Sequence, residues 1–179
     1  RLRLEMVARR AALSVAEHDA LSSRHLSHAL AALLPPVVAA FCWPIKHEPD
    51  VRGLLTAWAR AGVRTALPVV VAEGQPLAFR EWTPETPLAP DRYGIPTPTT
   101  GKWLTPDLIL LPLNGFDAAG YRLGYGGGYS ARTSAALAPR PLAVGVGFEI
   151  NRVDSIRPEA HDQRLDWIVT ENGAFRPVA

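Results

Sequence analysis

The stretch that decides the fold is Asp107-Leu108-Ile109-Leu110-Leu111-Pro112-Leu113, which is soon followed by Gly120-Tyr121-Arg122-Leu123-Gly124-Tyr125-Gly126-Gly127-Gly128-Tyr129. The first segment is apolar without alternation, as is typical of a strand buried on both faces of a parallel sheet. The glycines of the second segment allow backbone N–H groups to approach an anion closely, and a helix predicted over 129–137 would point its positive end at the same place. The two segments together predict a phosphate or carboxylate site at the carboxyl end of a strand.

Strands and helices alternate along the rest of the chain. Helices are predicted over 2–10, from a capping box at Ser14 and Glu17 onward, and after Asp50 as far as Gly62. Further strands are predicted at Val37–Cys42, at Val63–Val71 with an interruption at Pro68, and at Leu77–Trp82, Leu142–Phe148 and Trp167–Thr170. This order predicts an α/β fold with a parallel sheet covered on both faces, in one domain over residues 1–179.

Composition excludes several classes of protein. The formal net charge is +2 without a basic stripe, which argues against a nucleic-acid partner. Cys42 is the one cysteine, so no disulfide framework is expected, and no apolar run has the roughly 18 residues needed to span a membrane. We expect a cytoplasmic protein and a monomer. The proline-rich segment 83–100 is predicted to be an ordered surface loop around Tyr93.

The glycine segment is not one of the common nucleotide motifs. It lacks the G-x-x-x-x-G-K-[ST] pattern, and Ala131 stands where a G-x-G-x-x-G pattern counted from Gly126 would end. A plain glycine-rich turn is the simpler alternative, and an unrelated nucleotide-dependent oxidoreductase is disfavoured by the missing fingerprint. Arg122 favours a binding function, because a guanidinium beside inward-facing N–H groups clamps phosphate.

The chain as a whole resembles the 5-formyltetrahydrofolate cyclo-ligase (5,10-methenyltetrahydrofolate synthetase) family. The resemblance rests on the segment 107–117 followed by 122–129, and on further motifs that fall in the family's order. These are the arginine-rich N-terminal helices, Trp43-Pro44 with Glu48, Gly94-Ile95-Pro96 with Pro98, and the tail from His161 to Asp166 with Val169-Thr170.

The resemblance implies an enzyme that uses ATP and Mg²⁺ to convert 5-formyltetrahydrofolate into 5,10-methenyltetrahydrofolate, with release of ADP and phosphate. It implies that the formyl oxygen attacks the γ-phosphate and that N10 traps the resulting iminium phosphate. Such chemistry needs alignment of the reactants and neutralisation of phosphate charge rather than a nucleophilic side chain. The implied fold is a Rossmann-like three-layer α/β/α sandwich with a mainly parallel sheet, of the sugar-isomerase and CoA-transferase type.

The resemblance also implies roles for particular residues. Arg122 and Tyr129 would act at the reacting groups, and Asp166 would bind Mg²⁺. The ATP site would comprise Arg3, Arg122, Leu123, Gly124, Tyr125, Gly126, Gly127, Gly128, Tyr129 and Ser130. The folate site would comprise Trp43, Glu48, Tyr93, Tyr125, Gly126, Gly127, Gly128 and Tyr129. A phosphate-binding lysine of the family would precede Arg1.

Each of these residues has a structural alternative. Trp43 follows a buried strand and could belong to the core alone, and Glu48 could be a solvated charge at a helix entry. Arg3 could lie on the surface. His161 and Asp162 are read as a turn held by side-chain hydrogen bonds rather than as a metal or acid–base pair, and Asp117 as a brace for the glycine segment.

Two positions depart from the family pattern. Ala131 replaces an aspartate associated with Mg²⁺, and a methyl group cannot coordinate a cation that requires oxygen ligands. Gly127 stands where many members carry a lysine. The alternative function is therefore a catalytically weak or inactive paralogue that binds folate or nucleotide.

Overall fold

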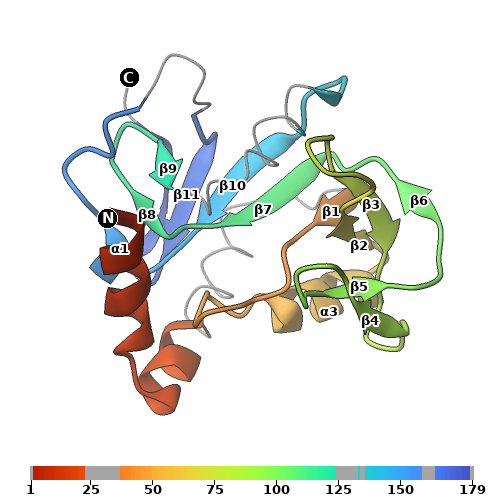
Figure 1. Ribbon diagram of the computed structural model, residues 1–179, viewed down its shortest axis with the longest axis horizontal. Coiled ribbons are helices and arrows are strands. Elements are labelled where there is room, and N and C mark those ends of the chain that lie inside the picture. The colour runs from red at the N-terminus through yellow and green to blue at the C-terminus, as the bar shows by residue number, and fades with distance from the viewer. Residues whose placement is uncertain (1, 23–36, 124–132, 134–135, 159–163, 178–179) are drawn as a thin grey trace.

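The computed structural model describes residues 2–22, 37–123, 133, 136–158 and 164–177. Within these ranges one large sheet organises the chain, and its strands lie in the order β12-β11-β10-β7-β1-β2-β3-β6 (Figure 1). The five neighbours from β11 to β2 pair in parallel, and the strands at both edges pair antiparallel. The expected alternation of strands and helices has thus produced a mixed α/β fold around a parallel centre.

The bounds of the sheet strands follow the apolar segments of the sequence closely. They are β1 (Val38–Ala40), β2 (Arg64–Val69), β3 (Ala78–Glu81), β6 (Trp103–Leu104), β7 (Leu108–Pro112), β10 (Leu142–Val146), β11 (Trp167–Thr170) and β12 (Gly173–Phe175). Two small antiparallel pairs lie outside this sheet. They are β4 (Leu88–Pro90) with β5 (Pro96–Pro98), and β8 (Gly115–Phe116) with β9 (Arg122–Leu123).

The interruption predicted at Pro68 does not occur. β2 continues through Pro68, which pairs with Phe79 of the antiparallel neighbour β3. On its other side β2 pairs with β1 only from Arg64 to Ala66, so the missing N–H of proline falls beyond that ladder.

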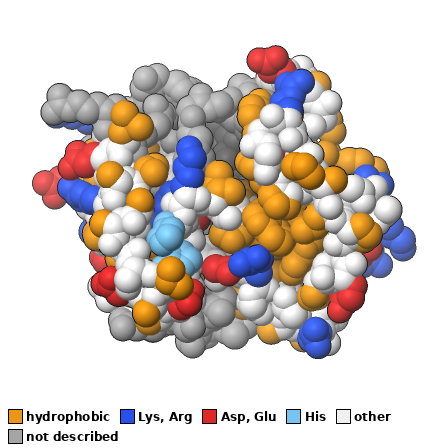
Figure 2. All heavy atoms as spheres, turned by 60° about the horizontal axis from the view of Figure 1, so that its bottom comes forward, with side chains coloured by type: hydrophobic (Ala, Val, Ile, Leu, Met, Phe, Trp, Pro, Cys, Tyr) orange, Lys and Arg blue, Asp and Glu red, His pale blue; other side chains and the backbone are white. Residues whose placement is uncertain are grey.

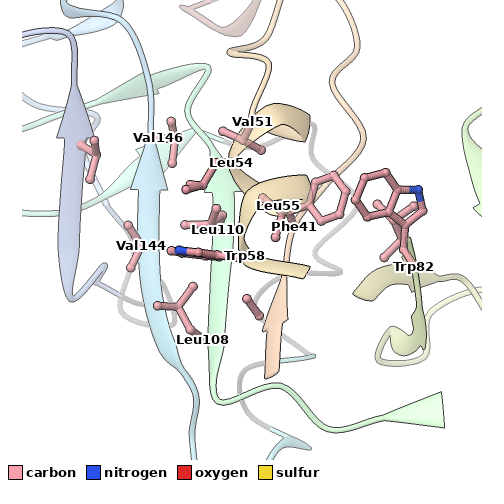
Figure 3. Close-up of a cluster of buried hydrophobic side chains, with 13 residues drawn as sticks. Phe41, Val51, Leu54, Leu55, Trp58, Trp82, Leu108, Leu110, Val144 and Val146 are labelled. Atoms are coloured by element: carbon pink, nitrogen blue, oxygen red, sulfur yellow. The ribbon is translucent and has the colours of Figure 1, made fainter. Parts of the chain in front are cut away.

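Helix α3 (Arg52–Arg60) covers one face of the sheet. Its buried side chains are Leu54, Leu55 and Trp58; in Figure 3 Leu54 and Trp58 lie over the strands β7 and β10, and Leu55 lies beside Phe41. On the neighbouring part of the same core, Phe41 meets Trp82 edge to face with ring centroids 5.0 Å apart. A second buried cluster, which includes Ile109, Phe116 and Ile168, forms a separate core.

The helix ends are close to their predicted positions. Val51 is the N-cap of α3 and makes no side-chain cap; Asp50, the expected cap, lies one residue earlier, and its carboxylate accepts the Arg52 N–H at 3.0 Å. Gly62 follows the helix with φ +98°, the left-handed conformation that favours glycine.

The N-terminal helix α1 (Leu2–Ala11) is followed by the predicted capping box. The Glu17 N–H donates to Ser14 Oγ at 3.1 Å, and the Ser14 N–H donates to Glu17 Oε1 at 3.0 Å. These reciprocal bonds start the helical turns that follow α1. Most of the predicted helix that begins at Ser14 lies outside the described residues.

The predicted surface loop at 83–100 contains the β4–β5 pair. Its turn is held by the Asp91 carboxylate, which accepts the N–H groups of Tyr93 at 2.8 Å and Ile95 at 3.0 Å. Gly94 supplies the positive φ of this turn. The loop is therefore ordered, as expected, and includes short strands that its proline content concealed.

Candidate active site

The carboxyl ends of β1 and β7 carry the residues that form the candidate site. Cys42 and Trp43 follow β1, and Leu113 and Asn114 follow β7. Cys42, Glu48 and Pro112 line one narrow cavity of about 10 Å³, enough for about one water. Its position agrees with the rule that ligands of open parallel sheets bind beyond the carboxyl ends of the strands.

Glu48 is buried, with 2% of its surface exposed. Its carboxylate Oε1 accepts the Ile45 N–H at 2.9 Å, and its own N–H donates to the Ile45 carbonyl at 2.9 Å. The turn between them passes through Lys46 and His47, which have φ values of 49° and 61°. Left-handed backbone at two consecutive non-glycine residues stores strain, which is common where a loop presents a functional group. The alternative of a solvated surface charge is wrong, because the side chain is buried.

Histidines lie beside this turn. The ring of His18 contacts that of His47, with centroids 4.9 Å apart, and His18 Nε2 donates to the Glu48 carbonyl at 2.7 Å. A carbonyl only accepts, so Nε2 carries the proton. In Figure 2 the histidine side chains lie together on the surface, next to acidic side chains and a broad hydrophobic area.

Trp43 is half-buried and packs against the core under α3, which fits both its expected roles. The Arg52 guanidinium lies over its ring, 4.9 Å from the centroid. Asp50 holds that guanidinium through Nε at 2.9 Å and Nη2 at 2.7 Å. Burial is the largest single effect on the pKa of Asp50 and raises it. The hydrogen bonds and the charge of Arg52 outweigh burial when taken together, so the pKa of Asp50 is lowered. One face of Trp43 is thus fixed by a cation.

Arg122 lies on β9, in a hairpin that the sequence did not predict. Its guanidinium donates to the Pro112 carbonyl from Nη2 at 3.0 Å and from Nε at 3.3 Å. Asp117 holds the turn of the hairpin, because its buried carboxylate accepts the N–H groups of Tyr121 at 3.2 Å and Ile156 at 3.1 Å. The expected role of Asp117 as a brace is confirmed.

Cys42 lies within electrostatic range of both charged residues, Glu48 and Arg122. Burial and, to a smaller extent, the Glu48 carboxylate raise the pKa of the Cys42 thiol to about 12, while the Arg122 guanidinium acts in the opposite direction. Both charged residues, predicted for different ligands, therefore act on the Cys42 thiol, and Arg122 is hydrogen-bonded to Pro112, which lines the same cavity as Cys42 and Glu48. We call Cys42, Glu48 and Arg122 the edge group.

Arg10 was not predicted, although it ties this region together. Its side chain is fully buried on α1, where Nε donates to the Lys46 carbonyl at 2.9 Å. Nη1 donates to Asn114 Oδ1 at 2.9 Å and to the Leu113 carbonyl at 3.3 Å. Its acceptors are distant in the sequence and are mostly backbone carbonyls, so no residue spacing indicates them.

Tyr93 and Asp166 do not belong to the edge group. Tyr93 lies at the turn between β4 and β5 with 55% of its surface exposed, and Thr97 of the same hairpin contacts the Pro68 carbonyl. Asp166 lies at the amino end of β11, where Oδ2 accepts the Ala143 N–H at 2.7 Å. Arg140 Nη1 contacts both Asp166 oxygens, at 3.3 and 3.4 Å.

The surroundings of Asp166 do not fit a magnesium ion. Both carboxylate oxygens already receive N–H donors, and among the described residues the other charged side chains that line the hollow beside it are Arg140, Arg164 and Arg176. Magnesium prefers carboxylate, carbonyl and water oxygens at short range. Within the described ranges, no group of three or more histidine, cysteine and acidic residues has an arrangement suited to a metal.

Several predicted site residues lie outside the described residues. They are Gly124, Tyr125, Gly126, Gly127, Gly128, Tyr129, Ser130 and Ala131, together with His161 and Asp162 and the side chain of Arg3. Leu123, the last described residue of the glycine segment, is half-buried on β9 beside Gly115. The roles of the residues outside the described ranges remain predictions from the family resemblance.

The sheet and the edge group define an α/β protein with a candidate ligand site beyond the carboxyl ends of its parallel strands. Comparison with known proteins agrees with this class. Residues 1–171 match the model of the 5-formyltetrahydrofolate cyclo-ligase family. The 5-formyltetrahydrofolate cyclo-ligase of Mycolicibacterium smegmatis is 29% identical over 71% of this chain and 70% of that protein. The enzyme of the same name from Escherichia coli K12 is 31% identical over 76% of this chain and 81% of its own.

Solved structures give the same result. The 5,10-methenyltetrahydrofolate synthetase of Aquifex aeolicus superposes with a TM-score of 0.83 and 29% identity, covering 99% of this chain and 92% of that chain. The synthetase of Mycoplasma pneumoniae shares the fold with a TM-score of 0.78 at 24% identity, covering 95% of this chain and 96% of that chain. This protein belongs to the 5-formyltetrahydrofolate cyclo-ligase family and is an enzyme of the ligase class.

Proposed function

We propose that this protein converts 5-formyltetrahydrofolate into 5,10-methenyltetrahydrofolate with conversion of ATP to ADP and phosphate. Family membership and the names of the relatives support the activity. The observation in the structure that carries the proposal is the edge group: the buried Glu48 carboxylate lines a cavity, and the Arg122 guanidinium is bonded to Pro112 of the same cavity. The two substrates require these two groups, because the pterin heterocycle of the folate can donate hydrogen bonds to a carboxylate and the phosphates of ATP need a cation.

Glu48 is our candidate for binding the pterin. A carboxylate accepts hydrogen bonds only, and the pterin ring offers N–H donors in one plane. Burial of Glu48 strengthens such bonds, since little water competes for its oxygens. Trp43, held by Arg52 on one side, supplies a flat apolar surface close by in the chain. Tyr93 is retained as a proposed folate contact on the resemblance alone.

Arg122 is our candidate for neutralising phosphate charge, together with the backbone of 123–130 and with Arg3. In the proposed scheme the formyl oxygen attacks the γ-phosphate, N10 of the folate then attacks the formyl carbon, and the phosphate leaves with the former formyl oxygen. Arg122 on its rigid hairpin would hold the transferring group in line with the formyl oxygen. Tyr129 stays a proposed contact at the same place.

Magnesium, when bound, would offset the charge of the phosphates, as in other phosphoryl transfers. Because the residues around Asp166 do not fit this ion, no step of the scheme is assigned to a metal held there. Ala131 also lacks the carboxylate expected in the family. These two observations favour the second candidate function, a weak or inactive paralogue that binds folate or nucleotide.

We also propose a finer description of the fold. The parallel centre of the sheet and the two separate buried clusters support a Rossmann-like three-layer sandwich in one domain over 1–179. We further propose that the enzyme acts in the cytoplasm as a monomer without nucleic-acid partners. In the described part of the chain, the helices are too short or too polar to cross a bilayer.

The decisive experiment combines the protein with ATP, Mg²⁺ and 5-formyltetrahydrofolate and follows the methenyl product by its near-ultraviolet absorbance. Product that depends on ATP supports the cyclo-ligase. If both ligands bind, by calorimetry, and no product forms, the paralogue is the better description. A reaction without ATP is the matched control, because 5-formyltetrahydrofolate alone should give no enzymatic methenyl product.

A further inference from the structure

The loop after β1 carries two of the proposed folate contacts, Trp43 and Glu48, and helical turns from the N-terminal part of the chain lie against it (Figure 1). Three side chains of these turns bond backbone groups of the loop at every second residue. The bonds are those of Arg10 Nε to the Lys46 carbonyl at 2.9 Å, of His18 Nε2 to the Glu48 carbonyl at 2.7 Å, and of the Asp50 N–H to Ser22 Oγ at 3.1 Å.

The loop needs such support because its backbone is strained just before Glu48. Lys46 and His47 have φ values of 49° and 61°, in the left-handed region that residues with a Cβ seldom adopt. A turn of this kind persists only where its surroundings hold it in place. A bond to the Glu48 carbonyl, at the end of the strained turn, therefore restrains the residue that carries the carboxylate.

The ring of His18 is itself held in one orientation. It contacts the ring of His47, with centroids 4.9 Å apart, and meets the ring of Phe148 edge to face at 5.7 Å. Phe148 is fully buried and follows β10, at the carboxyl end of that strand. Only 15% of the His18 side chain is exposed. Because packing against two rings restricts its rotamers, Nε2 stays directed at the Glu48 carbonyl.

We propose that His18 is a positioning residue for the folate site, because its Nε2–H holds the Glu48 carbonyl and thereby aims the carboxylate that would bind the pterin. The inference rests on the proposed role of Glu48. A carboxylate that meets the N–H donors of a planar ring loses bond strength when its backbone rotates, since hydrogen bonds depend on direction. Arg122 is held by another bond, to the Pro112 carbonyl, so ATP binding should not depend on His18.

Ligand titrations of His18 variants test the proposal. His18→Phe keeps a ring for the packing and removes the donor, so we expect 5-formyltetrahydrofolate to bind roughly tenfold more weakly and ATP to bind as in the parent. His18→Gln offers an N–H donor at a similar reach and should recover most of the folate affinity. Asp19→Asn is the matched control, because the exposed Asp19 carboxylate lies 3.8 Å from His18 Nδ1, beyond hydrogen-bond distance.

Three results would overturn the proposal. They are an unchanged folate affinity in His18→Phe, an equal loss of folate and ATP binding in that variant, and a His18→Gln variant as weak as His18→Phe. Melting temperatures followed by circular dichroism show whether each variant is folded. If His18→Phe does not fold, His18→Asn takes its place, because its amide is polar but too short to reach the carbonyl.

Glu48→Gln separates failure of this inference from failure of the proposed function. In that background His18→Phe should cause a smaller fold-loss of folate affinity than in the parent, because both residues act through one carboxylate. Equal fold-losses in the two backgrounds would show that His18 does not act through Glu48 and would overturn the inference alone. If Glu48→Gln by itself left folate binding unchanged, the pterin role of Glu48 would be wrong, and the positioning role with it.

Discussion

Arg10 Nη1 donates a hydrogen bond to Asn114 Oδ1 at 2.9 Å, with 0% and 1% of the two side chains exposed. The same guanidinium binds the Lys46 carbonyl, two residues before Glu48. Helix α1 is therefore bonded to the loop after β1 and to the loop after β7. The loop after β1 carries Cys42 and Glu48, and the loop after β7 leads to the hairpin that carries Arg122. Arg10 couples the N-terminal helix to the geometry of the candidate site.

Replacing Arg10 by methionine should destabilise the protein by about 2–4 kcal/mol, because the carbonyls of Lys46 and Leu113 and the Asn114 amide would stay buried without their donor. Urea unfolding followed by circular dichroism measures the change. Arg9→Met is the matched control, since Arg9 forms a surface pair with Glu5 and its loss should cost less than about 1 kcal/mol. Equal losses would show that the buried bonds contribute little.

Glu48→Gln should weaken binding of 5-formyltetrahydrofolate by about 1.5–3 kcal/mol, the range for a hydrogen bond to a charged group, and leave ATP binding nearly unchanged. The glutamine keeps the size of the side chain and its oxygen can still accept the Ile45 N–H. Fluorescence or calorimetric titration with each ligand separates the two effects. Glu85→Gln, at an exposed position, is the control. An unchanged folate affinity would remove Glu48 from the proposed pterin site.

Arg122→Ala should weaken ATP binding by about 1.5–3 kcal/mol, and folate binding less. Arg122→Lys keeps the charge but cannot donate from two nitrogens to the Pro112 carbonyl, so we expect an intermediate loss. Separate titrations with ATP and folate give the ratio. If both ligands were lost equally, the hairpin would have collapsed, and a lower melting temperature would accompany that result.

Much of the architecture could be predicted because local signals and tertiary packing agree. The apolar runs at β7 and β10 are buried on both faces, and Ser14 with Glu17 forms the expected capping box. Short elements were missed for a physical reason. The pairs β8–β9 and β4–β5 have strands of two or three residues and are set by turns at Asp117 and Asp91, so no period of two develops in the sequence.

The candidate site could be predicted where a single charged residue within a motif would contact the ligand. Glu48 and Arg122 were selected from family motifs; Glu48 lines the cavity, and Arg122 is bonded to Pro112, another residue of its lining. Arg10 could not be found, because its acceptors come together only in the fold. The partner of Asp166 is Arg140, 26 residues earlier, and no sequence pattern links them. A sequence motif identifies an acidic residue, but only its neighbours in the fold decide whether its carboxylate binds a metal ion or an arginine.

Ala131→Asp should strengthen the dependence of activity or ATP binding on Mg²⁺, because the substitution restores the oxygen ligand of the family pattern. Asp166→Asn should leave the magnesium titration unchanged, since Arg140 and the Ala143 N–H already occupy that carboxylate. Titration of Mg²⁺ in the presence of ATP, followed by calorimetry, compares the two variants with the parent chain. Loss of magnesium binding in Asp166→Asn would return Asp166 to the metal site.

The Cys42 thiol provides a test of the edge group that needs no ligand. Its pKa of about 12, against an ordinary value of 9.0, leaves it protonated at neutral pH, so alkylation by iodoacetamide should be slow in the folded protein. Glu48→Gln removes a cause of the raised pKa and should speed alkylation at pH 8–9, whereas Arg122→Gln removes the opposing charge and should slow it. Mass spectrometry of the alkylated chain gives the rates, with the urea-unfolded protein as reference.

The same pKa shift fixes the sign of a pH effect on stability. Below pH 9 the thiol is protonated in both states, and its contribution to stability is fully present. Between pH 9 and about 12 the unfolded chain loses this proton before the folded chain does, so the free energy of unfolding should fall as pH rises. Cys42→Ser lacks this titration and should show a shallower fall in urea-unfolding experiments over that range. Parallel pH profiles for the two proteins would mean that Cys42 titrates normally and that Glu48 does not lie beside it.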